Sequence, residues 1–64
     1  MEDWQERVLK EKVELDGRIR KLYAFLTDDD KLRSTDGRTI SMLDRQMQAM
    51  NEYSSALNER IILF

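Results

Sequence analysis

The sequence predicts an all-α protein, an antiparallel two-helix hairpin that self-associates into a helical-bundle oligomer. Proline is absent and only two of the 64 residues are glycine, so the composition favours helix nearly throughout. Two stretches carry apolar residues at helical spacing, and a polar segment separates them. A single domain of this length, residues 1–64, buries little apolar surface. Because cysteine and histidine are absent, self-association is the remaining way to supplement the core.

The first helix is expected over residues 2–26. Acidic side chains in its first turns interact favourably with the helix dipole. Acid-first pairs at i, i+4 spacing add support, and they are Glu6 with Lys10, Glu14 with Arg18 and Asp16 with Arg20. Apolar residues form one seam facing a partner helix, which Lys12 interrupts. The seam consists of Val8, Leu15, Ile19, Leu22 and Leu26.

A connector is expected over residues 27–36, where cap-forming and turn-forming residue types surround a single apolar residue, Leu32. Its acidic run, residues 28–30, lacks the alternating spacing of a calcium loop and is expected to be solvated. The second helix is expected over residues 37–63, capped by a residue between 34 and 36. Its seam alternates intervals of three and four, and its members are Ile40, Leu43, Met47, Met50, Ser54, Leu57, Ile61 and Phe64.

Antiparallel pairing brings the polar interruptions of the two seams together. If facing residue numbers sum to about 65, Leu15 faces Met50, and Lys12 lies level with Ser54. The two exceptions then form one polar layer. Such a layer fixes the register or the oligomeric state at some cost in stability, and it can also be a site.

One flank of the seam is the predicted binding surface, because tryptophan, tyrosine and arginine are enriched at interface hot spots. Two intramolecular explanations stay open: Trp4 stacks on Arg60 in a cation–π contact, and Tyr53 is a boundary residue. The other flank, with Asp16 and Tyr23, resembles an ordinary polar rim. Basic residues near the connector either pair with aspartates or form an anion site. The candidate ligand-binding or partner-binding residues are Trp4, Lys12, Arg18, Arg45, Tyr53 and Arg60.

Apolar residues outside the seam predict the oligomer interface, because a two-helix hairpin has one seam and cannot cover them all. Leaving the apolar C-terminal residues in water would forgo several kcal/mol of burial. The predicted interface residues are Leu9, Val13, Ile62, Leu63 and Phe64.

The composition also excludes classes of function. Without an imidazole base or a thiol nucleophile the common catalytic arrangements cannot be built, so we expect no enzyme, catalytic residue, metal or cofactor. A net charge of −2 argues against binding duplex nucleic acid. No apolar run is long enough to span a membrane, and the first residues do not form a secretory signal. A soluble, cytoplasmic protein is expected.

Several short segments carry a family resemblance: residues 3–8, 14–15, 21–22, 25–26, 46, 49–50, 53–54, 57 and 60–61. In these segments the chain resembles a widespread family of short phage and prophage proteins related to a protein of a crAss-like phage. The resemblance covers almost the whole chain, and residues 35–39 depart from the usual pattern of acidic residues and glutamine. It implies a viral accessory protein acting in the host cytoplasm.

Two hypotheses of different class follow. In the first, the protein is a counter-defence sponge, an oligomer that sequesters a nucleotide immune signal such as a cyclic nucleotide without cleaving it. Phosphates would then contact Lys12, Arg18 and Arg45, and a base would stack on Trp4 or Tyr53. In the second, the flank that carries Trp4, Tyr53 and Arg60, which we call the aromatic flank, docks onto a host defence protein. A structural or scaffold role in the phage is a third interpretation. The first is preferred because oligomers build composite pockets.

Overall fold

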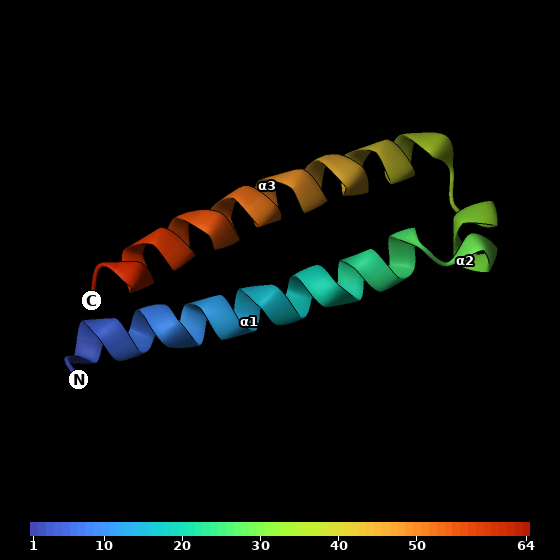
Figure 1. Cartoon of the computed structure of the whole chain (residues 1–64). Coiled ribbons are helices and arrows are strands. Elements are labelled where there is room, and N and C mark those ends of the chain that lie inside the picture. Colours follow the sequence, from blue (N-terminus) through green and yellow to red (C-terminus); the bar gives the residue numbers. More distant parts are fainter.

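The computed structural model describes residues 1–64 as three helices without a strand: α1 (Asp3–Leu26), α2 (Asp29–Arg33) and α3 (Gly37–Ile62). The long helices α1 and α3 lie side by side and run in opposite directions, so both chain ends lie at one end of the molecule (Figure 1). We call this the open end. The molecule measures 46 × 15 × 13 Å. The prediction of an all-α fold is confirmed.

Local hydrogen bonds explain where the two long helices begin. The backbone N–H of Glu2 donates to the side-chain oxygen of Gln5 at 2.9 Å, so Glu2 caps α1 and lies just outside it. The side chain of Asp36 accepts from the backbone N–H of Thr39 at 3.2 Å and caps α3. At the other end of α3, Leu63 is the C-cap residue, so the helix ends one residue earlier than the pattern indicates.

The connector contains the short helix α2, where the sequence analysis predicted only a polar turn. The side chain of Asp28 accepts from the backbone N–H groups of Asp30 and Lys31 at 3.1 and 3.3 Å. Asp28 is therefore the N-cap of α2, and the two aspartates after it lie in the first turn, where the helix dipole favours negative charge. The acidic run is a helix start as well as a solvated segment.

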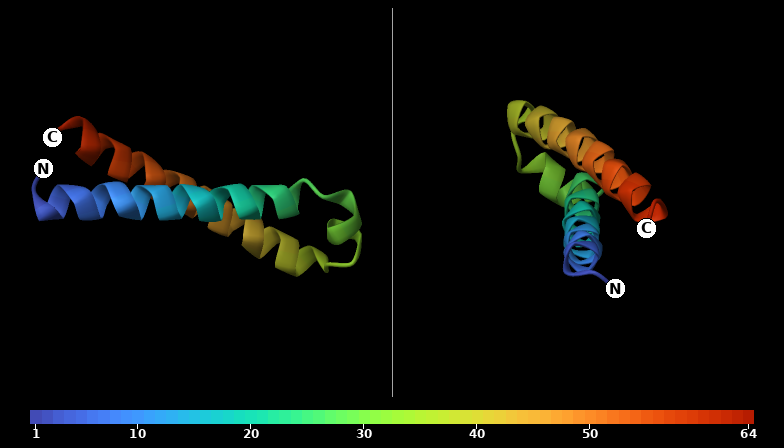
Figure 2. Two further views of the ribbon diagram at one scale, coloured as in Figure 1. Left: turned by 90° about the horizontal axis from the view of Figure 1, so that it is seen from below. Right: turned by 90° about the vertical axis from the view of Figure 1, so that its left-hand side faces the viewer.

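The apolar core is small and lies between α1 and α3. Val8, Leu15 and Leu57 form its central cluster, and Met47 is the only other buried side chain. All four belong to the predicted seams. The helices cross obliquely (Figure 2), and the central cluster lies towards the open end. One chain therefore leaves most of its apolar side chains partly or largely exposed.

None of the three expected acid-first pairs along α1 forms an ion pair within contact distance. The structure contains two ion pairs, Lys12 with Asp16 and Arg33 with Asp30. Asp16 does not bond forward to Arg20, because its carboxylate is turned towards α3, where Ser54 and Lys12 hold it. None of the three helices combines the length and the apolarity that a bilayer crossing requires.

Candidate ligand-binding site

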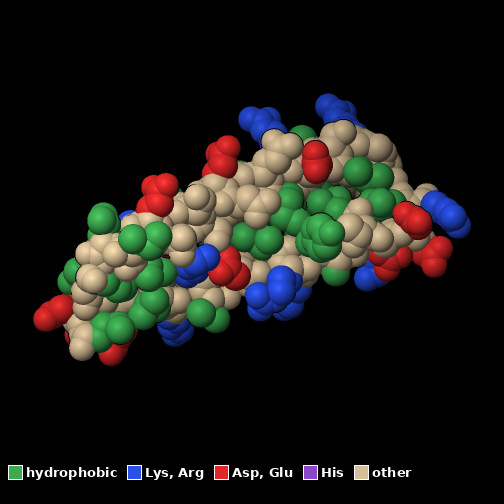
Figure 3. Space-filling model, viewed as in Figure 1, with side chains coloured by type: hydrophobic (Ala, Val, Ile, Leu, Met, Phe, Trp, Pro, Cys, Tyr) green, Lys and Arg blue, Asp and Glu red, His purple; other side chains and the backbone are tan.

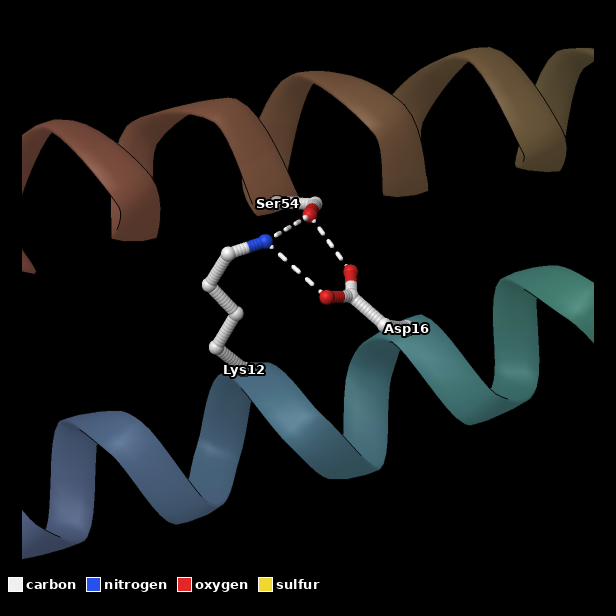
Figure 4. A network of polar contacts seen from close by, with 3 residues as sticks. All are labelled: Lys12, Asp16 and Ser54. Atoms are coloured by element: carbon white, nitrogen blue, oxygen red, sulfur yellow. Dashed lines mark hydrogen bonds and ion pairs between the residues drawn. The ribbon is translucent and has the colours of Figure 1, made fainter.

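A polar layer joins α1 to α3 in the middle of the molecule (Figure 4). The hydroxyl of Ser54 donates to Asp16 Oδ1 at 2.6 Å, and Lys12 Nζ donates to Asp16 Oδ2 at 2.9 Å and to Ser54 Oγ at 3.0 Å. The predicted meeting of Lys12 with Ser54 is confirmed. Asp16, which the sequence analysis left on a rim, completes the layer.

The positive and negative charges of this layer neutralise each other. The hydrogen bond from Ser54 and then that from Lys12 hold the pKa of Asp16 below its ordinary value of 3.8. The carboxylate is therefore ionised at neutral pH, and the ammonium of Lys12 neutralises it at 2.9 Å. Because its charge is already paired, Lys12 is a weaker phosphate ligand than its place on the seam indicates.

A polar hollow of about 590 Å³ opens over this layer between α1 and α3. In the space-filling view, charged side chains of both signs lie in the middle of the trough between the helices (Figure 3). Arg20 lies on its rim, is exposed and takes part in neither ion pair. The amides of Asn51 and Asn58, both exposed, can donate and accept. The lining residues are Lys12, Asp16, Ile19, Arg20, Asn51, Ser54, Ser55 and Asn58.

An apolar hollow of about 670 Å³ continues the trough towards the connector. It shares Ile19, Arg20 and Asn51 with the polar hollow, so the two form one groove along the same side of the molecule. Hydrophobic side chains gather there in Figure 3. Half of the lining is hydrophobic, and the residues that belong to this hollow alone are Tyr23, Leu26, Thr27, Asp44 and Met47.

The structure places only one of the six predicted binding residues, Lys12, in the groove. The cation–π contact between Trp4 and Arg60, which the sequence analysis left open, does not form. The ring of Trp4 packs edge-on against Phe64, with ring centroids 5.2 Å apart and an interplanar angle of 86°. The remaining predicted residues are exposed, line no hollow and form no ion pair, and they are Arg18, Arg45, Tyr53 and Arg60.

The predicted interface residues lie mostly on the surface of the single chain. Val13, Ile62 and Leu63 are 69, 72 and 85% exposed, whereas Leu9 is half-buried. Phe64 is 40% exposed and packs on Trp4 of its own chain, which gives it an intramolecular role as well. The oligomer remains a prediction.

The sequence analysis missed Asn51 and Asn58 as groove residues, and it placed Arg20 only among the basic residues near the connector that could form an anion site. A signal for them is present in the spacing. On α1, polar residues recur every four positions from Lys12 to Arg20, and on α3 they recur every three or four from Asn51 to Asn58. Each run forms a polar stripe directly beside a seam. Two such stripes that face each other across antiparallel helices can line a polar groove.

Comparison with known proteins places the chain in a family. The family model described as Sequestin matches residues 2–63. The chain belongs to the Sequestin family. The name of the family suggests a sequestering function, which means holding another molecule. No curated protein and no solved structure matches the chain. The match to the Sequestin model spans nearly the same residues as the resemblance to phage proteins, but it carries no link to a crAss-like phage.

Proposed function

We propose that this Sequestin-family protein is a small phage-encoded counter-defence protein that acts as an oligomeric sponge for a nucleotide immune signal. The observation that carries the proposal is the polar hollow, where the exposed guanidinium of Arg20 lies on the same rim as two asparagine amides. The family name supports sequestration as the mode of action. The phage origin rests on the resemblance described above.

The chemistry of the hollow suits a nucleotide. The guanidinium of Arg20 is a planar fork that binds a phosphate through two parallel hydrogen bonds. Asn51 and Asn58 each offer a donor and an acceptor, which match the edge of a base or the hydroxyls of a sugar. The ionised carboxylate of Asp16 lies at the floor of the hollow, already paired with Lys12, so it does not repel the phosphate strongly.

The proposed mode of action is binding without conversion of the ligand. A general base needs a pKa near the working pH, and the hydrogen bonds from Ser54 and Lys12 move the pKa of Asp16 away from that range. Sequestration instead requires that the bound ligand is released unchanged. The protein then lowers the free concentration of the signal in proportion to its own abundance.

A second candidate function is the docking of the aromatic flank onto a host defence protein. The specific observation in its favour is that Trp4 and Tyr53 are 49 and 47% exposed, so both rings offer apolar surface to a partner. This function depends on the flank opposite the groove, which makes the two candidates separable by mutation.

The experiment that tests the proposal is calorimetric titration of the purified protein with a panel of cyclic mono- and dinucleotides, using the matching nucleosides as controls without phosphate. We expect saturable binding of at least one nucleotide with a dissociation constant of about 1 μM or tighter, and no binding of its nucleoside. Chromatography after release should recover the nucleotide intact. Equal affinity for nucleotide and nucleoside, or recovery of a cleaved product, would contradict the proposal.

A further inference from the structure

Two surface features are not explained by a ligand in the polar hollow. The first is the neighbouring apolar hollow, where the ring of Tyr23 is 62% exposed. The second is the group of exposed apolar side chains at the open end, which includes Ile62 and Leu63. Monomeric proteins rarely leave contiguous apolar surface in water, so both features call for a partner.

The elongated chain has the surface area that a contact with a partner needs. A folded chain of 7.7 kDa has an accessible surface of about 4,300 Å² on the usual scaling. The single chain exposes 5182 Å², roughly 900 Å² more. A standard protein interface buries about 800 Å² per partner. The elongated shape, 46 × 15 × 13 Å, produces such an excess, and a chain of this length can contribute an interface of about the standard size.

Two apolar residues near the open end, Leu9 and Ile62, lie on the groove side of their helices. Ile62 follows Asn58 by four residues, and Leu9 precedes Asp16 by seven, so each continues a stripe that lines the groove. Tyr23 follows Asp16 by the same seven residues. The apolar end and the apolar hollow are thus spaced equally on either side of the polar layer.

We propose that a second copy of this chain packs across the groove, related to the first by a two-fold axis that passes beside the Lys12–Asp16–Ser54 layer. The axis places Leu9 and Ile62 of each copy in the apolar hollow of the other copy. The surface is self-complementary, as a two-fold interface requires: apolar ends meet apolar hollows, and the polar middle meets itself.

This arrangement rests on the oligomeric form of the proposed function and adds the second wall of its site. The polar hollow is open in one chain, and a second copy closes it. Each copy then contributes one Arg20 to a shared polar chamber at the axis. The ligand class that fits this chamber carries two separated phosphates, because two guanidinium groups approach it from opposite helices.

The first test measures mass by sedimentation equilibrium on nucleotide-free protein. We expect twice the mass of one 7.7 kDa chain for the wild type. Ile62→Lys should weaken the dimer by about 100-fold or more, because the two-fold axis repeats the loss. Leu63→Lys is the matched control: it is equally exposed, but it lies about 140° around the helix from Asn58 and should leave the dimer intact. A monomeric wild type, or equal dissociation by both variants, would overturn the proposal.

The second test uses the absence of cysteine in the chain. The double variant Tyr23→Cys with Ile62→Cys should form a covalent dimer under mild oxidation. Within one chain Ile62 lies at the open end, where Phe64 packs on Trp4, whereas Tyr23 lies about 28 Å further along α1, which is too far for a disulfide. Met42→Cys with Ile62→Cys is the control, because Met42 is exposed two and a half turns from Asn51, on the opposite side of α3. Equal cross-linking of both pairs would overturn the arrangement.

The two proposals fail separately. Both dimer tests use protein without nucleotide, whereas the proposed function is tested by titration. A dimer with the expected cross-link that binds no nucleotide would contradict the sponge and leave the dimer standing. A nucleotide-binding monomer would contradict the dimer and leave the binding function standing.

Discussion

The two flanks of the helix pair carry similar residue types and differ in shape. The flank with Trp4, Arg18, Tyr53 and Arg60 presents aromatic rings and arginines, but none of these residues lines a hollow. On the other flank, Arg20 and the asparagines converge on a concave surface with a satisfied polar floor. Ligand sites need several groups that point to one volume. Residue type pointed to the aromatic flank, because tryptophan, tyrosine and arginine are common at interfaces. The concave surface lies on the other flank, where several polar groups can contact one ligand.

The largest expected effect is on nucleotide binding, and it is tested by reversing the charge of one arginine on each flank. Arg20→Glu removes the phosphate fork from the hollow and should weaken nucleotide binding by about 100-fold, whereas Arg18→Glu should change it less than about threefold. The two residues are neighbouring exposed arginines of α1, so the overall charge changes equally. Titration calorimetry measures both. A larger loss for Arg18→Glu would return the site to the aromatic flank.

The next effect concerns the open end. Trp4→Ala removes the edge-on contact with Phe64 and should lower the free energy of unfolding by about 1–2 kcal/mol. Arg60→Ala should change it by less than about 0.5 kcal/mol, since Arg60 is exposed and makes no ion pair. Urea unfolding followed by circular dichroism provides the measurement. Equal losses would reinstate the cation–π contact.

A smaller effect distinguishes the floor of the groove from its rim. Ser54→Ala breaks the hydrogen bonds to Asp16 and Lys12 and should cost about 1 kcal/mol of unfolding free energy. Ser55→Ala is the matched control: Ser55 is exposed, and its hydroxyl makes no hydrogen bond within the chain, so we expect almost no change. If the two variants unfold at the same urea concentration, the polar layer contributes no stability.

The smallest effect is a dependence on pH. The pKa of Asp16 is lowered in the folded chain, chiefly by Ser54, so its contribution to stability is complete above the unfolded value and is lost as the pH falls through the folded value. The pKa of Asp36 is lowered by Thr39 and acts with the same sign. The urea midpoint should therefore fall on acidification below about pH 4. Asp16→Asn should reduce that slope and leave the part due to Asp36, and an unchanged slope would contradict the assignment.

Much of the fold follows from local patterns in the sequence. The seams of both helices and the meeting of Lys12 with Ser54 depend on periodicity alone, and the cap of α3 depends on residue type. The short helix α2 was missed because three consecutive aspartates look the same whether they are solvated or form the start of a helix. Side-chain rotamers decide between them, and periodicity does not contain that information.

The candidate site was less predictable, for a geometric reason. Which flank becomes concave depends on how α1 and α3 cross, and a helical wheel holds no information on the crossing (Figure 2). Asn51 and Asn58 were therefore interpreted as part of a polar rim, and Arg20 only as one of the basic residues near the connector. The partner of Trp4 also escaped prediction, because Phe64 belongs to the seam in the heptad pattern, whereas its ring turns to the end of α1 in the structure. Family membership came from comparison rather than from these patterns.

The Lys12–Asp16–Ser54 layer has an evolutionary consequence. Replacing Lys12 or Asp16 alone leaves the other charge without its ion-pair partner, and replacing Ser54 removes one hydrogen bond from each of them. Each single replacement therefore costs stability, which favours inheritance of the layer as one unit. Among related chains we expect the three positions to vary together, either as another matched polar set or as a wholly apolar layer that changes how copies pair.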